Sequence, residues 1–222
     1  GQCGPAVQTL SKGCKVAESM GEYLELSHSQ GLLGVSLAFT GQFEQARAMA
    51  DHCYETATQL RDPVRTAGAL FYRSVVADAE FDWKSGVEYS VRLLRFCEEF
   101  TISGIYLQLG ALMSGRHEFH VGQLRQAQIL LGNSLNLASV MGVKTSIGWA
   151  WAYLGDTLFA MGDFDEARRA YTSGLDPEKK RAKEDLAAGI GLGGLAHLEA
   201  VTTGSFDECV RLAEEAIARL SE

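Results

Sequence analysis

Residues 149–177, WAWAYLGDTLFAMGDFDEARRAYTSGLDP, predict two helices joined by a tight turn. The first helix places apolar or small side chains on one face, at Trp151, Leu154, Gly155 and Leu158. Gly162-Asp163 interrupts this pattern. The second helix then repeats the helical spacing at Phe164, Ala167 and Tyr171. This stretch therefore indicates a helical hairpin.

The turn of this hairpin recurs along the chain. Variants of Gly-x-Phe-x-x-Ala place an aromatic or apolar anchor at Phe43, Trp83, Leu124, Phe164 and Phe206. Successive anchors are 40, 41, 40 and 42 residues apart. An interval this regular predicts a repeat of about 40 residues. Cys3 lies 40 residues before Phe43, so the chain is expected to open on the second helix of an incomplete repeat.

This interval predicts a single repeat domain over residues 1–222, with about eleven helices. The expected division is a half-unit at 1–21 followed by units at 22–61, 62–101, 102–142, 143–182 and 183–222. The sequence has no sustained alternation of apolar and polar residues, so it predicts no strand. The fold class expected is all-α.

Small residues stand where the two helices of a hairpin would cross. Gly34 and Gly155 occupy equivalent places in first helices, and Ala46 and Ala167 do so in second helices. Larger side chains there would separate the helices at a cost of about 1–3 kcal/mol. One hairpin cannot bury its own apolar face, so neighbouring hairpins must stack into an α-solenoid.

The second repeat departs from the pattern, and a cap supports the helix boundary before it. Phe81 and Gly86 stand in this repeat where other repeats have glycine and alanine, so the packing there is less well defined by the sequence. Asp62-Pro63 predicts the start of a first helix, because aspartate caps helices and proline fits their first position.

Composition excludes several classes of function. A formal net charge of -8 argues against a nucleic-acid-binding face. No apolar run approaches the ~20 residues of a membrane span. The five cysteines form no Cys-x-x-Cys pair, which favours reduced thiols in a cytoplasmic protein, with one reactive thiol as the alternative. The first residue is Gly1, which suggests a fragment of a longer chain.

Three short motifs each suggest a function, but each also has a structural interpretation. Gly189 to Gly194 matches Gly-x-Gly-x-x-Gly, but no strand precedes it, so close helix packing is preferred to phosphate binding. His117-Glu118-Phe119-His120 is one residue short of a zinc motif and lacks a third ligand. The basic cluster at residues 179–183 has a small partner or nucleic-acid patch as its functional alternative, but acidic residues flank it, so a solvated link is preferred. We therefore expect no catalytic, cofactor or metal residues, and no enzyme.

Residues 149–177 resemble the tetratricopeptide repeat (TPR), with Trp-x2-Leu-Gly-x2-Leu followed by Gly-Asp-Phe-x2-Ala, tyrosine and a closing proline. The resemblance covers nearly all of the chain and implies a right-handed superhelical solenoid that binds a peptide or partner domain in a groove lined by first helices. Carried over by register, the implied groove residues are Phe71, Leu112, Arg116, Phe119, His120, Trp149, Asp156 and Phe159. The lysine and asparagine of chaperone-binding members are missing.

The longer unit resembles, more loosely, the helical-repeat arms of bacterial signalling ATPases, nucleotide cyclases and maltose-regulator-type activators. The resemblance implies a regulatory scaffold, or alternatively an arm that senses a small molecule between its helices. Self-association through Cys3–Ala17 or Phe206–Leu220 is a further alternative, since the ends of a truncated solenoid would expose apolar surface.

Overall fold

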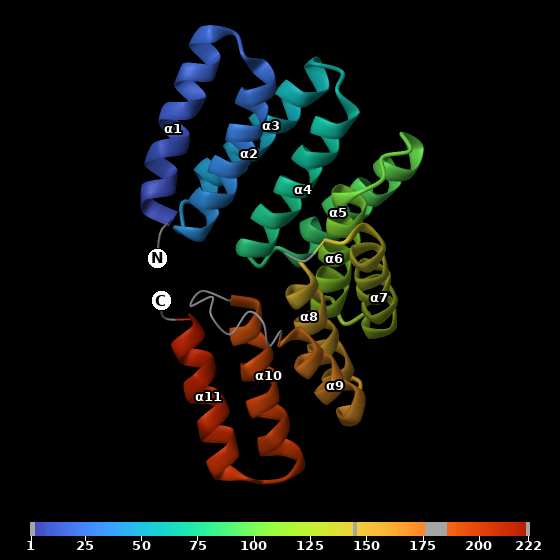
Figure 1. Ribbon diagram of the computed structural model, residues 1–222. Helices are drawn as coiled ribbons and strands as arrows, with labels where there is room; N and C mark the ends of the chain where they lie inside the picture. The colour runs from blue at the N-terminus through green and yellow to red at the C-terminus, as the bar shows by residue number, and fades with distance from the viewer. Residues whose placement is uncertain (1–2, 144–145, 176–185, 221–222) are drawn as a thin grey trace. The chain divides into compact units, whose positions relative to one another are not determined.

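The computed structural model describes residues 3–143, 146–175 and 186–220, and within these ranges it has eleven α-helices and no strand (Figure 1). The helices are α1 (Cys3–Met20), α2 (Tyr23–Phe39), α3 (Phe43–Gln59), α4 (Pro63–Ala79), α5 (Trp83–Glu99), α6 (Ile105–His120), α7 (Leu124–Met141), α8 (Ile147–Ala160), α9 (Phe164–Gly174), α10 (Leu186–Thr202) and α11 (Phe206–Leu220). The all-α prediction is confirmed. Asp176-Pro177 and the charged segment after it lie outside the described residues.

The recurring anchor residues mark where second helices begin. They are the first residues of α1, α3, α5, α7, α9 and α11: Cys3, Phe43, Trp83, Leu124, Phe164 and Phe206. Helix α4 begins at Pro63, and the Asp62 side chain accepts a hydrogen bond of 3.0 Å from the Arg65 amide. The turn and cap signals therefore located these helix starts from local chemistry alone.

The chain forms two compact units, Gly1–His117 (unit 1) and Glu118–Glu222 (unit 2). In unit 1, α2 contacts α1, α3 and α4, and α4 contacts α3 and α5. In unit 2, α8 contacts α7, α9 and α10, and α10 contacts α9 and α11. Within each unit a first helix thus packs on its hairpin partner and on the first helix of the next repeat, which is the stacking of a solenoid.

Glycines let these helices approach closely. A methyl group at Gly34 of α2 would lie 3.0 Å from the carbonyl oxygen of Ala46 in α3, which confirms the predicted crossing. A methyl group at Gly31 would lie 2.0 Å from Cδ2 of Tyr72 in α4. Gly31 therefore makes room for a tyrosine ring of the next first helix.

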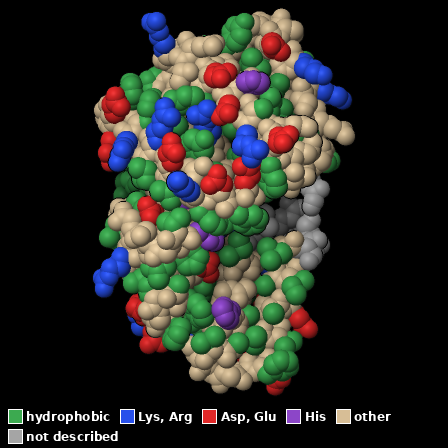
Figure 2. All heavy atoms as spheres, turned by 180° about the vertical axis from the view of Figure 1, so that it is seen from behind, with side chains coloured by type: hydrophobic (Ala, Val, Ile, Leu, Met, Phe, Trp, Pro, Cys, Tyr) green, Lys and Arg blue, Asp and Glu red, His purple; other side chains and the backbone are tan. Residues whose placement is uncertain are grey.

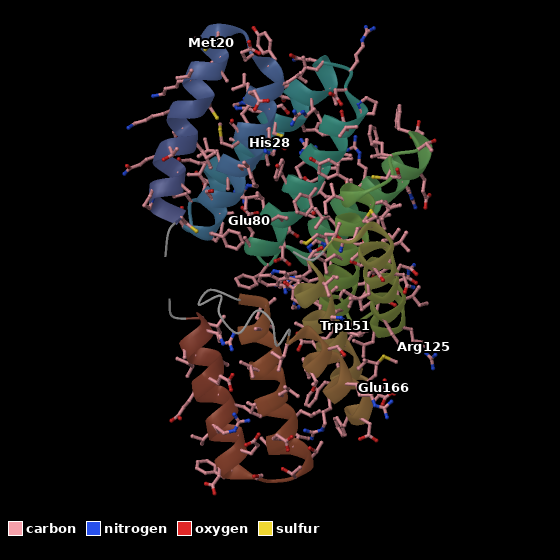
Figure 3. The ribbon with its side chains drawn as sticks, in the orientation of Figure 1. Met20, His28, Glu80, Arg125, Trp151 and Glu166 are labelled. Atoms are coloured by element: carbon pink, nitrogen blue, oxygen red, sulfur yellow. The ribbon has the colours of Figure 1, made fainter. Side chains whose placement is uncertain are left out.

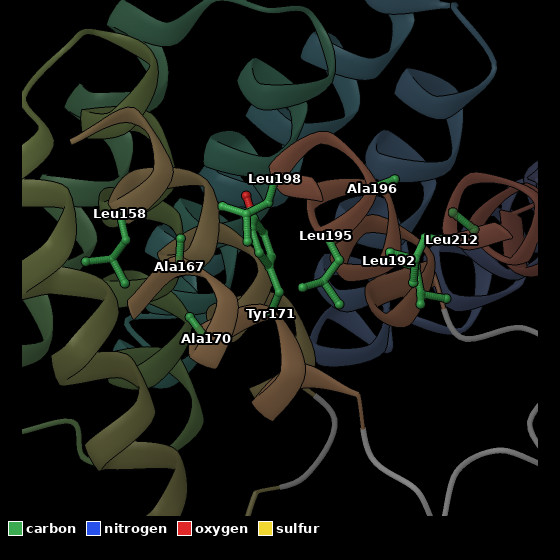
Figure 4. Close-up of a cluster of buried hydrophobic side chains, with 10 residues drawn as sticks. Leu158, Ala167, Ala170, Tyr171, Leu192, Leu195, Ala196, Leu198 and Leu212 are labelled. Carbon is green, nitrogen blue, oxygen red and sulfur yellow. The ribbon is translucent and has the colours of Figure 1, made fainter. Parts of the chain in front are cut away.

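The core of unit 2 is organised around Tyr171 of α9 (Figure 4). Its buried ring lies between α8 and α10, where methyl groups at Gly155 and Gly194 would come within 2.4 and 2.3 Å of it. Its hydroxyl donates a 2.7 Å hydrogen bond to Oδ1 of Asp156. Burial, together with the Asp156 carboxylate, raises the pKa of Tyr171, so the phenol keeps its proton.

The turn within the second hairpin carries backbone strain that the glycine turns within the other hairpins avoid, although Arg61 and Thr101, in turns between hairpins, also have positive φ. Gly41 and Gly162 adopt φ values of 78° and 81° before their second helices, and Phe81 adopts φ 59° at the equivalent place. The left-handed conformation costs a residue with a Cβ atom roughly 1–2 kcal/mol, whereas glycine adopts it freely. The Phe81 side chain is 73% exposed and meets Trp83 edge-on, with ring centroids 5.5 Å apart.

Phe81→Gly should therefore stabilise unit 1. Relief of strain outweighs the loss of one exposed edge contact, and the expected gain is about 0.5–1 kcal/mol in the free energy of unfolding. Urea denaturation of the two proteins measures it. A less stable glycine variant would show that the Phe81–Trp83 contact dominates.

Candidate functional site

An apolar stripe runs along one side of α2 in unit 1. Its members follow the helical spacing of four, four, three and four residues: Leu24, His28, Leu32, Val35 and Phe39. Leu24, Leu32 and Phe39 are 46%, 37% and 63% exposed. The opposite side of α2 buries Leu26, Leu33 and Leu37, so the α2 stripe is a second apolar face that the hairpin does not use.

The α2 stripe continues onto α4 through Phe71, a predicted groove residue. Val35 and Phe71 are both half-buried and pack against the same core cluster, which contains Cys53, Ala57, Ala69 and Tyr72. The Phe71 and Tyr72 ring centroids are 5.7 Å apart. His28 is labelled on α2 in Figure 3. It shares a hydrogen bond of 3.0 Å between its Nδ1 and Oη of Tyr72, which ties the stripe to the neighbouring first helix. The surface is thus held by a packed core.

Arg116, another predicted groove residue, is fixed by an ion pair. Its Nε lies 2.5 Å from Oδ1 of Asp78 on α4, and both side chains are largely buried. The fully buried His117 places Nε2 3.6 Å from the same oxygen. Burial acts to raise the pKa of the Asp78 carboxyl, but the neighbouring His117 and Arg116 outweigh it and hold that pKa below its ordinary value.

Asp78, His117 and Ser90 form a line that resembles a hydrolase triad. His117 Nδ1 lies 3.3 Å from Ser90 Oγ, but that hydroxyl already donates to the Gly86 carbonyl oxygen at 2.8 Å. Ser90 and His117 are both fully buried, so no substrate reaches either atom. A methyl group at Gly86 would lie 2.7 Å from Cδ2 of His117. These polar groups therefore pack around the buried ring of His117, and the missing side chain of Gly86 leaves room for that ring.

Leu112 was predicted to line the groove, but its side chain is 5% exposed. It lies in a run of buried residues from Gly110 to Gly115, so it offers a partner little surface. The sequence register places a residue on a helix face but does not tell how deeply the neighbouring helices cover that face, so the groove role of Leu112 stays a prediction.

The remaining predicted groove residues belong to unit 2, and most have ring contacts. The Phe119 and His120 centroids are 5.1 Å apart, and the Trp149 and Tyr153 centroids are 5.8 Å apart. Phe159 lies between two rings, 4.6 Å from His197 and 5.5 Å from Phe164. Asp156 accepts the Tyr171 hydrogen bond, so this carboxylate supports the core as well as any surface. The partner-binding role of these residues stays a prediction.

Among the described residues, the short motifs that also suggested a function have structural roles. Gly189 and Gly194 lie within helix α10 and admit Leu220 and Tyr171, as close packing predicts. No group of three or more potential metal ligands occurs in the described ranges. None of the described helices is long and apolar enough to cross a membrane. On the face of unit 1 seen in Figure 2, basic and acidic side chains are interspersed.

Stacked helical hairpins with recurring turns define a helical-repeat protein. Comparison with known protein families identifies the type of repeat. A family model described as tetratricopeptide repeat matches residues 27–52 and 148–171. These segments span most of the α2–α3 and α8–α9 hairpins. The two matched hairpins resemble the tetratricopeptide repeat, and the chain has a TPR-like helical-repeat fold. The sequence matches no curated protein. The looser resemblance to signalling ATPase and cyclase arms stays a prediction.

Solved structures share this fold at low sequence identity. BtubC (BKLC) from P. vanneervenii is 12% identical, with a TM-score of 0.76 over 97% of this chain and 90% of that one. Repeats of a Podosopora anserina protein described as a kinesin light chain are 16% identical, with a TM-score of 0.66 over 86% and 93%. A Rap protein complexed with Competence and Sporulation Factor is 14% identical, with a TM-score of 0.73 over 98% and 66%.

Leu24, His28 and Leu32 of the α2 stripe are not among the groove residues that the sequence register implied. The signal was present, because these residues follow one another at intervals of four. Helix α2 is apolar on two sides, so the sequence alone does not distinguish the buried face from the exposed one.

Proposed function

We propose that this chain is a non-catalytic interaction module that binds an apolar segment of a peptide or partner protein. The observation that carries the proposal is the exposed α2 stripe, which continues to Phe71 over a packed core. Exposed aromatic and aliphatic side chains on a rigid support are typical of binding surfaces, because they bury large areas without first having to be ordered. The Rap structure, which contains a bound factor, supports binding as a use of this fold.

The partner chemistry follows from the surface. The stripe contains no acidic residue, lysine or arginine, so the docked face should be apolar, with aliphatic or aromatic anchors at helical or extended spacing. Arg116, held by Asp78, supplies a cation that fits an acidic residue flanking those anchors. We further propose that the module acts in the cytoplasm, in line with its free thiols.

Selection from a library of short random peptides tests the proposal. Peptides selected on the immobilised chain should be enriched in aromatic and aliphatic residues, and the variant Leu32→Ser/Phe39→Ser should bind them at least about tenfold more weakly. Phe206→Ser is the control, because it removes an aromatic ring from unit 2 that is even more exposed than Phe39. Equal binding by wild type and the double variant would contradict the α2 stripe as the binding surface.

The same peptides test the predicted groove residues of unit 2 and the predicted groove residue Arg116 of unit 1. Loss of binding in Trp149→Ala, or in a folded Arg116→Glu variant, would support a role for that residue in peptide binding. Retention of binding in both, together with loss in the α2 variant, would restrict the site to the stripe and Phe71.

A further inference from the structure

The space between second helices α3 and α5 in unit 1 is closed by large side chains. The Arg73 guanidinium lies 4.2 Å from the Tyr54 ring centroid and 5.6 Å from that of Tyr89. Arg92 covers Tyr54 from the other helix at 5.1 Å. Arg73 also pairs with Asp51 at 2.5 Å. The cavity that remains has a volume of about 70 Å³.

The preceding space, between second helices α1 and α3 over first helix α2, lacks these side chains. The helices start 40 residues apart, at Cys3 and Phe43, at Tyr23 and Pro63, and at Phe43 and Trp83, so positions correspond directly. The residues in place of Tyr54, Arg73, Tyr89 and Arg92 are Cys14, Leu33, Met49 and His52. The cavity there has a volume of about 520 Å³. We call it the α1–α3 gap.

Apolar side chains form most of the α1–α3 gap. Val7, Cys14 and Met49 are half-buried in its walls and pack against the core cluster that includes Leu33 and Leu37 in its floor. Burial raises the pKa of the Cys14 thiol, so this side chain is neutral at physiological pH. The polar residues that line the gap are Ser11, Lys15, Glu18, Gln30, Gln45 and His52.

We propose that the α1–α3 gap binds a small, uncharged, largely apolar molecule whose polar group lies at the rim. The volume falls within the range of about 300–1,000 Å³ typical of small-molecule sites, which are mainly apolar with a few polar groups. A charged group would lose its hydration over the floor of leucines, and the charged residues of the lining, Lys15 and Glu18, are exposed and of opposite sign. The ligand would supply from outside the packing that Tyr54, Tyr89 and Arg73 supply in the next gap.

This site is separate from the proposed peptide surface. The gap lies on the side of α2 that carries Leu33 and Leu37, whereas the α2 stripe carries Leu32 and Phe39. Ligand in the gap would brace α1 against α3 and so stabilise the first hairpins of unit 1. A molecule bound in the gap would contact α2, the same helix that presents the α2 stripe.

The uncharged fluorophore N-phenyl-1-naphthylamine is the probe for this site. The expected result is a saturable rise in fluorescence with one probe per chain. Probe at ten times its dissociation constant should slow alkylation of Cys14 by N-ethylmaleimide about tenfold, because only the unbound fraction reacts. Cys209, also half-buried but in unit 2, is the internal control, and its alkylation rate should not change. An unchanged Cys14 rate at saturating probe would overturn the proposal.

A filled gap tests the same proposal by substitution. Cys14→Tyr/Met49→Tyr introduces the tyrosines of the next gap and should reduce probe affinity at least about tenfold, as steric exclusion predicts. Val16→Tyr is the matched control, because Val16 is an exposed residue of α1 outside the gap. Full affinity in a folded double variant would overturn the assignment. Loss of folding in that variant, seen by circular dichroism, leaves the alkylation result on the wild-type chain to decide.

Discussion

Tyr171→Ala should destabilise unit 2 by about 3–5 kcal/mol, the range measured for removing a buried aromatic ring. Neither Gly155 nor Gly194 has a side chain that can move into the vacated space, so the cavity cannot collapse locally. The substitution also removes the hydroxyl that donates a hydrogen bond to Asp156. Urea denaturation followed by tryptophan fluorescence measures the effect, since Trp149 and Trp151 both lie in unit 2.

Tyr171→Phe separates the ring from the hydroxyl. It keeps the aromatic packing and removes only the hydrogen bond to the Asp156 carboxylate, so we expect a loss of about 1.5–3 kcal/mol, the range for hydrogen bonds to charged groups. A loss of similar size in both variants would assign the stability to the hydrogen bond. A loss below about 1 kcal/mol in Tyr171→Ala would show that the ring is not the centre of this core.

The helix starts were predictable because their causes are local. Phe43, Leu124 and Phe164 each follow a glycine turn by a fixed step, and Asp62-Pro63 combines a cap with a fixed backbone angle. Such signals depend on a few neighbouring residues and need no knowledge of the tertiary structure. The second repeat followed the same interval although Phe81 replaces glycine, because the stacked hairpins around it impose a left-handed backbone at a local cost.

The candidate site was only partly predictable because its causes are distant in sequence. The register correctly identified Phe71 and Arg116 as residues of first helices, but not the ion pair that fixes Arg116 to a residue 38 positions earlier. Gly86 looked like a defect in its repeat, whereas its missing side chain admits His117. The α1–α3 gap depends on which side chains are absent, and it becomes visible only when Cys14 is compared with Tyr54 in space.

Asp78→Ala should destabilise unit 1 by about 2–3 kcal/mol at neutral pH. Removing one partner of a buried ion pair costs about 3–5 kcal/mol, and the partial exposure of Asp78 and Arg116 reduces this figure. The variant would leave the Arg116 cation beside the buried His117 without a carboxylate between them. Urea denaturation at pH 7 checks the size of the effect, with Glu88→Gln as a matched loss of an exposed carboxylate from the same unit.

The same carboxylate should make the stability of unit 1 sensitive to acid. The pKa of Asp78 is lower in the folded chain than in the unfolded one, so its contribution is complete above its ordinary pKa. That contribution is lost as the pH falls through the lower, folded pKa, which places the window below about pH 4. Asp78→Asn should therefore lose less stability than the wild type between pH 5 and pH 3, in denaturation curves at roughly these two values. Parallel losses in the two proteins would mean that other carboxylates set the acid limit and that Arg116 and His117 do not hold Asp78 ionised.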